Sequence, residues 1–356
     1  MLVEEASERL LQLDKVFIMH PAYRSVMESI CFKLEVRKNL SEKPNFFVSG
    51  PSGIGKSTLR KHLISKYPIR RNARTIELPI GGKAVCDEIP VIAVSLKGQP
   101  TVIAMIRQML SKIGDPLFKK KEGKEDLEER LFHLLKVCGV RMVIVDEAQL
   151  IVDRDGIVRR FEIAEALKDL SERAQVSVCL LGMGRTRVIF EHDSQIARRW
   201  DEEIQLQPYD WGAIDEEDAN VESRLNFLAL LTVYRANMPV PLADEIDVED
   251  RRTAMKFFYV SRGIIGLLKK LILEATEIAC RANRSRIDNA TLSEAFCRAF
   301  IKERRRDGLG NPFSSGWIEQ LPPPLPDHSQ LLLPSKGRRS SRNDRRRAAN
   351  GALTKV

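Results

Sequence analysis

Four short apolar runs occur in the first two hundred residues, each bounded by polar or turn-forming residues. They cover residues 46–48, 91–94, 142–145 and 176–181. Short apolar runs of this length, interrupted here only by Ser177, are typical of strands buried on both faces of a parallel sheet. The stretches at 102–110, 127–137 and 161–174 repeat their apolar residues with the helical period instead. Strands that alternate with helices predict a doubly wound α/β domain, with a central parallel sheet flanked by helices.

The segments on either side of this alternation show no strand signal. Residues 1–45 have helical periodicity, interrupted at His20-Pro21, and predict an N-terminal helical segment. From about residue 210 to residue 307 the pattern is purely helical and predicts a small all-helical subdomain. The expected organisation is therefore a helical segment at 1–45, the α/β domain at 46–209, the helical subdomain at 210–307 and a tail at 308–356.

The predicted tail differs from the rest of the chain in composition and charge. It loses periodicity, contains the proline-rich run 321–326 and ends in a basic stretch, which predicts a flexible or disordered segment. The 356-residue chain has a formal net charge of +9. Residues 331–356 contain eight basic residues and one acidic residue, so +7 lies there and +2 remains for residues 1–330. An anionic partner is expected, and the body must contact it through a few placed cations.

Two classes of protein are disfavoured by what the sequence lacks. No apolar run approaches the roughly 20 residues that cross a bilayer, and the acidic N-terminus does not resemble a signal peptide. We therefore expect a cytoplasmic protein without a membrane partner. The six cysteines are scattered, with no CxxC pair, so reduced and mostly buried thiols are expected rather than a zinc site.

The clearest chemical signal is a phosphate-binding loop between the first strand and the helix after it. The loop matches GxxxxGK[ST] at every specified position, and its expected nucleotide-binding residues are Gly50, Pro51, Ser52, Gly53, Ile54, Gly55, Lys56, Ser57 and Thr58. Glycines let backbone N–H groups converge on phosphate oxygens, and the helix that follows adds a favourable dipole. Lys56 is expected to reach the β- and γ-phosphates of ATP, and the Ser57 hydroxyl to ligate Mg²⁺.

A second signal follows the third apolar run, where two acidic residues come directly after residues 142–145. This is the Walker B arrangement, in which Asp146 is expected to hold Mg²⁺ through water and Glu147 to act as general base on the attacking water. Alone, such a pair is a common strand-end turn. About 90 residues after the phosphate-binding loop, with strand–helix units between, it indicates an ATPase-type site.

Two groups of cations are candidates for roles outside a chain's own nucleotide site. Arg198 and Arg199 follow the fourth strand by a helix, where oligomeric ATPases often place an arginine that reaches a neighbour's γ-phosphate. Arg199 is the preferred candidate, and a helix-end cation that complements the dipole is the alternative. Lys119, Lys120 and Lys121 are candidates for phosphate contacts with a polyanion, and a solvated loop is the alternative.

The order of these motifs resembles that of the AAA+ ATPases of the TnsC/TniB transposition group. Relatives of that group include the Mu phage transposition protein B and the secretion-type ExeA ATPases. The resemblance covers about residues 15–315. Its more specific marks are the sequences Val-Asp-Glu-Ala-Gln at 145–149, Ser-Lys-Ile-Gly-Asp-Pro at 111–116 and Asn-Pro-Phe at 311–313.

The resemblance implies an AAA+ domain with a helical lid that binds ATP and Mg²⁺ and hydrolyses ATP slowly, as an assembly switch. It also implies a homo-oligomer, a ring or helical filament, on double-stranded target DNA, which recruits a TnsB/TniA-like transposase and is released on hydrolysis. Some members work with a TniQ-type or CRISPR-associated targeting protein. The family's DNA contacts correspond here to Lys97, just after the second strand, and to the three lysines at 119–121.

The sequence departs from the usual AAA+ pattern at two places. The polar sensor residue at the end of the fourth strand has no obvious counterpart, because Gly182-Met183 stands there. In the lid, Gly266 lies near the position at which many AAA+ proteins have an arginine. Both departures predict slow hydrolysis, which suits a switch better than a motor.

Three other functions remain alternatives at this point. A helicase or initiator loader is another DNA-bound AAA+ class, although no recognisable winged helix follows the lid. A secretion ATPase similar to ExeA would need a transmembrane segment or a peptidoglycan-binding domain, and neither is visible in the sequence. An adaptor that binds nucleotide without hydrolysing it is the third alternative.

Overall fold

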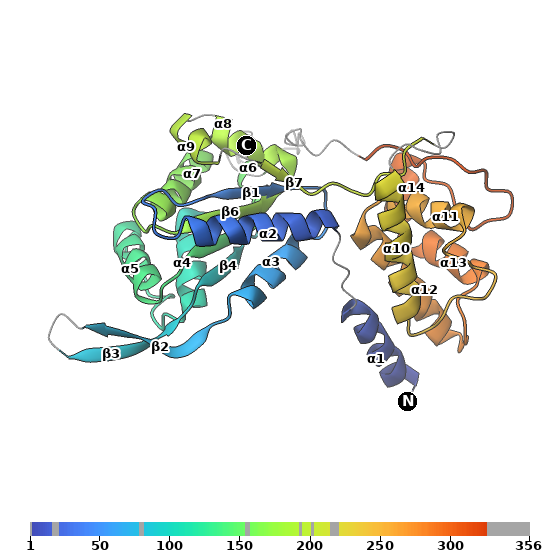
Figure 1. The fold of residues 1–356 in the computed structure, drawn as a ribbon, viewed down its shortest axis with the longest axis horizontal. Coiled ribbons are helices and arrows are strands. Elements are labelled where there is room, and N and C mark those ends of the chain that lie inside the picture. Colours follow the sequence, from blue (N-terminus) through green and yellow to red (C-terminus); the bar gives the residue numbers. More distant parts are fainter. Residues whose placement is uncertain are drawn as a thin grey trace, which may run out of the picture.

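The computed structural model describes residues 2–15, 21–77, 82–153, 157–191, 194–200, 203–213 and 221–325. Within these residues the chain forms an α/β body and a separate helical lid, joined by the segment that follows β7 (Figure 1). Helix α1 lies beside the lid rather than on the body (Figure 1). The fold class expected from the alternation of strands and helices is confirmed.

A parallel sheet of five strands forms the centre of the body. Its order is β4-β5-β6-β1-β7, and every neighbouring pair is parallel. The strands are β1 (Phe46–Ser49), β4 (Val91–Ser95), β5 (Met142–Asp146), β6 (Ser177–Gly182) and β7 (Glu203–Gln205). Because β1 lies inside the sheet, the loop that follows it opens between neighbouring strands at their carboxyl ends, where α/β sheets bind ligands.

Alternation of side chains along each strand places helices on both faces of the sheet. In β5, Val143 and Val145 belong to the core that includes residues of α4, α5 and α7, whereas Met142 and Ile144 belong to the core that includes residues of α2 and α3. These helices are α2 (Pro21–Val36), α3 (Lys56–Lys66), α4 (Val102–Ile113), α5 (Lys124–Val137) and α7 (Ile157–Glu172). The connections contain α6 (Leu150–Asp153), a 3₁₀ turn (Gly184–Arg187), α8 (Val188–Glu191) and α9 (Ser194–Arg199).

The lid has its own core, built around the edge-on and tilted aromatic rings of Trp211, Phe227 and Phe258. Its helices are α10 (Val221–Asn237), α11 (Arg251–Ser261), α12 (Ile265–Arg281), α13 (Asn289–Ala299) and α14 (Ile301–Asp307). Aspartate caps start α11 and α13, because Asp250 and Asp288 each accept a backbone N–H three residues on. The backbone hydrogen bond from Thr253 holds the pKa of Asp250 below its usual range, and the Thr291 hydroxyl, together with the Thr291 N–H, does the same for Asp288.

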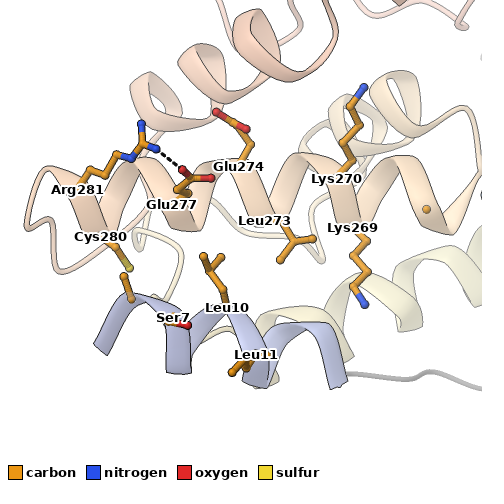
Figure 2. Close-up of a pocket in the computed structure, with 12 residues that line it drawn as sticks. Ser7, Leu10, Leu11, Lys269, Lys270, Leu273, Glu274, Glu277, Cys280 and Arg281 are labelled. Atoms are coloured by element: carbon orange, nitrogen blue, oxygen red, sulfur yellow. Dashed lines mark hydrogen bonds and ion pairs between the residues drawn. The ribbon is translucent and has the colours of Figure 1, made fainter. Parts of the chain in front are cut away.

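The N-terminal helical segment is divided between the two parts of the molecule. Helix α2 packs on the sheet, but α1 (Leu2–Lys15) lies along α12, and Leu13 is buried in the lid core. A groove of about 1110 Å³ runs between α1 and α12, with Leu10 and Leu273 facing each other across it (Figure 2). Periodicity alone predicts that such a helix forms and does not say which core its apolar face joins.

The flexible tail was expected to begin at residue 308, but the chain stays packed on the lid beyond that residue. The Phe313 ring is buried 5.5 Å edge-on from Phe257, and the Asn311 side-chain amide donates to the Ser293 hydroxyl at 2.7 Å. Residues 309–317 therefore lie against the lid, because aromatic anchors, which include Trp317 edge-on to Tyr259, hold a segment that lacks helical periodicity. The rest of the predicted tail, with its basic stretch, lies outside the described residues.

An antiparallel hairpin extends from the body and was not expected from the sequence. It consists of β2 (Arg70–Glu77) and β3 (Lys83–Glu88), whose side chains are mostly exposed or half-buried. Its strands are rich in charged residues and lack a clear apolar face, so they give no strand signal. Across the part of the chain that is described, no helix is long and apolar enough to cross a membrane.

Candidate nucleotide-binding site

The loop between β1 and α3 is the expected phosphate-binding loop, and its backbone leaves open space at Gly55. Gly55 adopts φ +114°, in the left-handed region, and the space beyond its Cα is open to 4 Å. Lys56 opens helix α3 and is only 9% exposed. Its ammonium group donates to the carbonyl oxygens of Gly50 at 2.7 Å and Pro51 at 2.9 Å. The lysine side chain therefore folds back over the loop, as a phosphate-binding lysine does.

The environment of Lys56 makes its positive charge costly. Burial lowers the pKa of Lys56 from 10.5 to about 8, and the charge of Arg185 acts in the same direction. The carboxylates of Glu147 and Asp146 oppose this shift. A bound phosphate would place a negative charge next to this buried ammonium and so stabilise its charged form.

Asp146 ends β5 and faces the phosphate-binding loop. Its side chain is almost fully buried, with one oxygen, Oδ1, accepting the Glu147 N–H at 2.9 Å. The other oxygen, Oδ2, lies 3.3 Å from the Ser57 hydroxyl. The sheet thus brings together a hydroxyl and a carboxylate that lie 89 residues apart in the chain.

These two groups fit the chemistry of Mg²⁺, which prefers oxygen ligands and keeps several waters. Ser57 is exposed at the mouth of the site, and Asp146 Oδ2 faces it from the floor. The remaining loop residues surround this point. Gly50 is half-buried, and its N–H donates to the carbonyl of Gly182. Of the other loop residues, Ile54 is buried, Pro51 and Thr58 are half-buried, and Ser52 and Gly53 are exposed.

Glu147 projects from the strand end with an exposed side chain and an unusual backbone. Its φ of +60° lies in the left-handed region, which costs a non-glycine residue about 1–3 kcal/mol. The Gln149 side-chain amide donates to Glu147 Oε2 at 2.6 Å, and Gln149 is itself buried. The Glu147 carboxylate is therefore held in place at the edge of the site by a residue two positions further on.

Three functional candidates at this site were not predicted from the sequence. Gln149 positions Glu147, Arg60 pairs with Asp146 at 2.9 Å, and Arg185 faces Lys56 closely enough to lower its pKa. Arg185 is buried in the 3₁₀ turn after β6, and its Nη2 donates to Asp153 Oδ2 at 2.7 Å. A charged side chain therefore does follow the fourth predicted strand, three residues beyond Gly182. The sequence Arg-Thr-Arg at 185–187 was the signal for it.

The lid is docked directly on the phosphate-binding loop. The Gly266 N–H, in the first turn of α12, donates to the carbonyl of Gly53 at 2.9 Å. A Cβ added at Gly266 would lie 2.7 Å from that oxygen and 2.8 Å from the Gly53 Cα. Glycine at this position therefore permits close approach of the lid, and a larger side chain would clash with the loop in this arrangement.

Replacing Gly266 by alanine is expected to lower the free energy of unfolding by about 1–3 kcal/mol, because the new methyl group overpacks the contact with Gly53. Urea unfolding would measure it. Gly310→Ala is the matched control, since its Cβ would have no neighbour closer than 3.7 Å. Equal midpoints for Gly266→Ala and the wild type would show that the lid does not depend on this contact.

The two arginine candidates lie away from the chain's own phosphate-binding loop. Arg199 pairs with Glu172 at 2.8 Å, and Arg198 is exposed beside it. Both line a polar surface pocket of about 590 Å³ whose other lining residues, Ser41, Glu42, Glu172 and Gln175, precede β1 or β6. That is the amino edge of the sheet, whereas the phosphate-binding loop follows the carboxyl edge. Either arginine would therefore need a neighbouring chain to meet a phosphate.

The lysine candidates are exposed, and their loop is held firmly. Arg107 of α4 donates to the carbonyl of Lys120, and Lys120 pairs with Glu122 at 3.0 Å. Arg130 of α5 contacts Asp115 at 3.2 Å and Glu122 at 2.8 Å. Arg130 also donates to the carbonyl of Leu117 at 3.3 Å. The loop that contains Lys119, Lys120 and Lys121 thus folds back beside α4, and two arginines bond its backbone. Lys97 is also exposed and precedes α4, at the other end of that helix.

Comparison with solved structures places this fold in a known class. The chain is similar to the Orc1 protein of Aeropyrum pernix in complex with DNA, at 16% identity and a TM-score of 0.56, over 83% of this chain and 70% of that one. It is similar to Cdc6p from Pyrobaculum aerophilum, at 12% identity and a TM-score of 0.56, over 84% and 74%. The ADPNP–ADP form of the A. pernix Orc2 protein gives 16% identity and a TM-score of 0.54, over 84% and 74%.

The fold is of the AAA+ type, with the architecture of the Orc and Cdc6 proteins, and the loop after β1 has the P-loop sequence. Within that class the chain belongs to the TniB family. The family model described as bacterial TniB protein matches residues 10–210, which is more than half of the chain. The resemblance to the TnsC/TniB group is thereby confirmed. No curated protein matches the sequence.

Proposed function

We propose that this protein is an ATP-dependent, DNA-binding regulator of DNA transposition. It assembles as a homo-oligomer on double-stranded target DNA when ATP is bound, recruits the transposase and is released when ATP is hydrolysed. The observation that supports this most is the TniB family match over residues 10–210, which includes both the phosphate-binding loop and the Asp146-Glu147 pair. A TnsB/TniA-like transposase is the proposed partner, with a TniQ-type or CRISPR-associated targeting protein as a further one.

ATP hydrolysis is supported by the groups that converge at the carboxyl edge of the sheet. Lys56 would bind the β- and γ-phosphates, while Ser57 and Asp146 would hold Mg²⁺, which neutralises phosphate charge as the γ-phosphoryl group departs. Glu147, held by Gln149, would accept the proton of the attacking water. The strained backbone of Glu147 supports a functional role, since such strain tends to gather at active sites.

Oligomerisation is supported by the position of the arginines. Arg199 lies at the amino edge of the sheet, and its partner Glu172 leaves its guanidinium one-quarter exposed. A neighbouring subunit that presents its phosphate-binding loop to this edge would receive Arg199, or Arg198, at the γ-phosphate. ATP would then be bound by two subunits at once, and hydrolysis would remove the γ-phosphate that both of them contact. This arrangement makes assembly depend on ATP.

DNA binding is supported by the lysine loop, by which we mean residues 114–123. Three exposed lysines follow one another there, and two arginines hold the backbone that presents them. Cations on successive subunits of an oligomer would follow the phosphates of a duplex and read little of its sequence. Lys97 would add a contact from the start of α4.

Neutralising the three lysines is expected to weaken DNA binding and to reduce its salt dependence. For the triple substitution of Lys119, Lys120 and Lys121 by glutamine, the slope of log K against log salt should fall by about 2–3, because each phosphate contact contributes about 0.9. Fluorescence anisotropy with a labelled random-sequence duplex and a slowly hydrolysed ATP analogue would measure both effects.

The matched control for this experiment neutralises exposed lysines on α3. Lys61→Gln with Lys66→Gln removes positive charge from another surface of the body and should leave the salt slope unchanged. Binding of the ATP analogue should be the same in all three proteins. If the loop variant binds duplex DNA with the wild-type slope, the lysine loop is not the DNA contact.

A further inference from the structure

Arg60 is placed where it competes with a metal ion for the same carboxylate oxygen. It lies on α3 three residues after Ser57, so both side chains are on one face of the helix and both point toward β5. Arg60 Nη1 donates to Asp146 Oδ2 at 2.9 Å, and the Ser57 hydroxyl lies 3.3 Å from the same oxygen. The other oxygen of Asp146 is occupied by the Glu147 N–H.

The two partners differ in their freedom to move. The Asp146 side chain is 3% exposed and is fixed by the strand end, whereas the Arg60 side chain is 25% exposed and reaches the surface along α3. Lys56 is also close enough for its charge to interact with Asp146, but Arg60 is the cation that bonds the buried carboxylate directly, so it stabilises Asp146 while no metal ion is bound. A divalent ion beside Asp146 would supply that charge and repel the guanidinium toward solvent.

We propose that Arg60 is a resident counter-ion of Asp146 that Mg²⁺ must displace, so that Arg60 sets the Mg²⁺ concentration at which nucleotide is held. The inference rests on the proposed function, because it assumes that Mg²⁺ and ATP bind between Ser57 and Asp146. It gives Arg60 a positioning role in that site, acting through Asp146. Nucleotide release would be accompanied by return of the guanidinium to the carboxylate, which keeps the site intact between rounds of ATP binding.

Replacing Arg60 by glutamine removes the competing charge, and the proposal predicts a lower Mg²⁺ requirement. Binding of a fluorescent ATP analogue to the full chain is measured at increasing Mg²⁺ and constant ionic strength. For Arg60→Gln, the Mg²⁺ concentration at half-saturation should fall about five- to tenfold, the effect expected for loss of one partly exposed charge next to the ion. Arg60→Lys keeps the charge and should stay within about twofold of the wild type.

A second measurement separates displacement from simple destabilisation. Without nucleotide, Arg60→Gln should unfold at a lower temperature than the wild type, because the carboxylate of Asp146 loses its cation. With Mg²⁺ and ADP this difference should disappear. Lys61→Gln is the matched control: it removes the same charge from the next residue of α3, which is exposed, and should change neither measurement.

The outcomes distinguish this inference from the proposed function. An unchanged Mg²⁺ requirement in Arg60→Gln overturns the inference, because Arg60 would then not compete with the ion. A raised requirement overturns it as well, because Arg60 would then orient Asp146 toward the ion. A wild-type protein that binds no ATP analogue at any Mg²⁺ concentration overturns the proposed function as well. If Arg60→Gln fails to fold, Arg60→Met and Arg60→Lys decide the question. A lower Mg²⁺ requirement in the methionine variant alone supports displacement, and equal requirements in both contradict it.

Discussion

Replacing Lys56 by alanine is expected to abolish ATP binding at micromolar concentrations of nucleotide. The ammonium group of Lys56 is buried over the loop and bonds two carbonyl oxygens that lie next to the expected phosphate position. Losing two charge-assisted hydrogen bonds to phosphate costs about 3 kcal/mol or more, which is a factor of at least about a hundred in Kd. A titration with a fluorescent ATP analogue would measure this loss.

The same substitution should leave the fold intact, which makes the binding result interpretable. Burial already lowers the pKa of Lys56, so removal of this charge relieves a desolvation cost. The thermal unfolding midpoint of Lys56→Ala should therefore lie within a few degrees of the wild-type value. Lys61→Ala, on the exposed side of α3, is the control for loss of a lysine. ATP binding within threefold of the wild type would exclude Lys56 as the phosphate-binding lysine.

Replacing Glu147 by glutamine should separate ATP binding from hydrolysis. Glutamine has the same shape and can still bond Gln149, but it cannot accept a proton from water. Loss of a general base lowers the rate by about 10²–10⁴-fold. Phosphate release should therefore almost stop, whereas the affinity for ATP should be unchanged. The substitution should also prolong the lifetime of ATP-dependent assemblies.

The control for this variant is Glu165→Gln, which removes a carboxylate from the exposed face of α7. It should hydrolyse ATP at the wild-type rate. The discriminating result is the decay of assemblies after free ATP is removed, followed by light scattering. Decay of Glu147→Gln assemblies at the wild-type rate would mean that Glu147 is not the base, or that hydrolysis does not release the subunits.

The strands that the sequence predicts are those that are buried along most of their length. β1, β4, β5 and β6 are buried along all or most of their length, so each contains a short run that is almost entirely apolar. β7 is half-buried and has only three residues, with Glu203 and Gln205 among them. Its strand conformation comes from pairing with β1, which a local pattern cannot reveal. The position of α1 is also set by a long-range contact: its periodicity predicts a helix but not that the lid covers its apolar face.

The residues of the candidate site also differ in whether the sequence predicts them. Lys56, Ser57 and Asp146 occupy positions in motifs whose spacing reflects backbone geometry, and the structure brings them together. Arg60 and Arg185 act through contacts with residues distant in sequence, which no local spacing reveals. Gln149 lies within the sequence at 145–149, but its contact with Glu147 depends on the turn that follows β5. The close contact between Gly266 and Gly53 is another long-range feature, and only the folded chain shows why a glycine stands there.

The central claim is that ATP assembles this protein on double-stranded DNA. It is tested most directly by mixing the full chain with a random-sequence duplex, Mg²⁺ and a slowly hydrolysed ATP analogue at low salt, and imaging the product by electron microscopy. The expected products are rings or filaments on the duplex that are absent with ADP and absent in Lys56→Ala. Monomers under all of these conditions, or oligomers that form equally well without nucleotide or DNA, would contradict it.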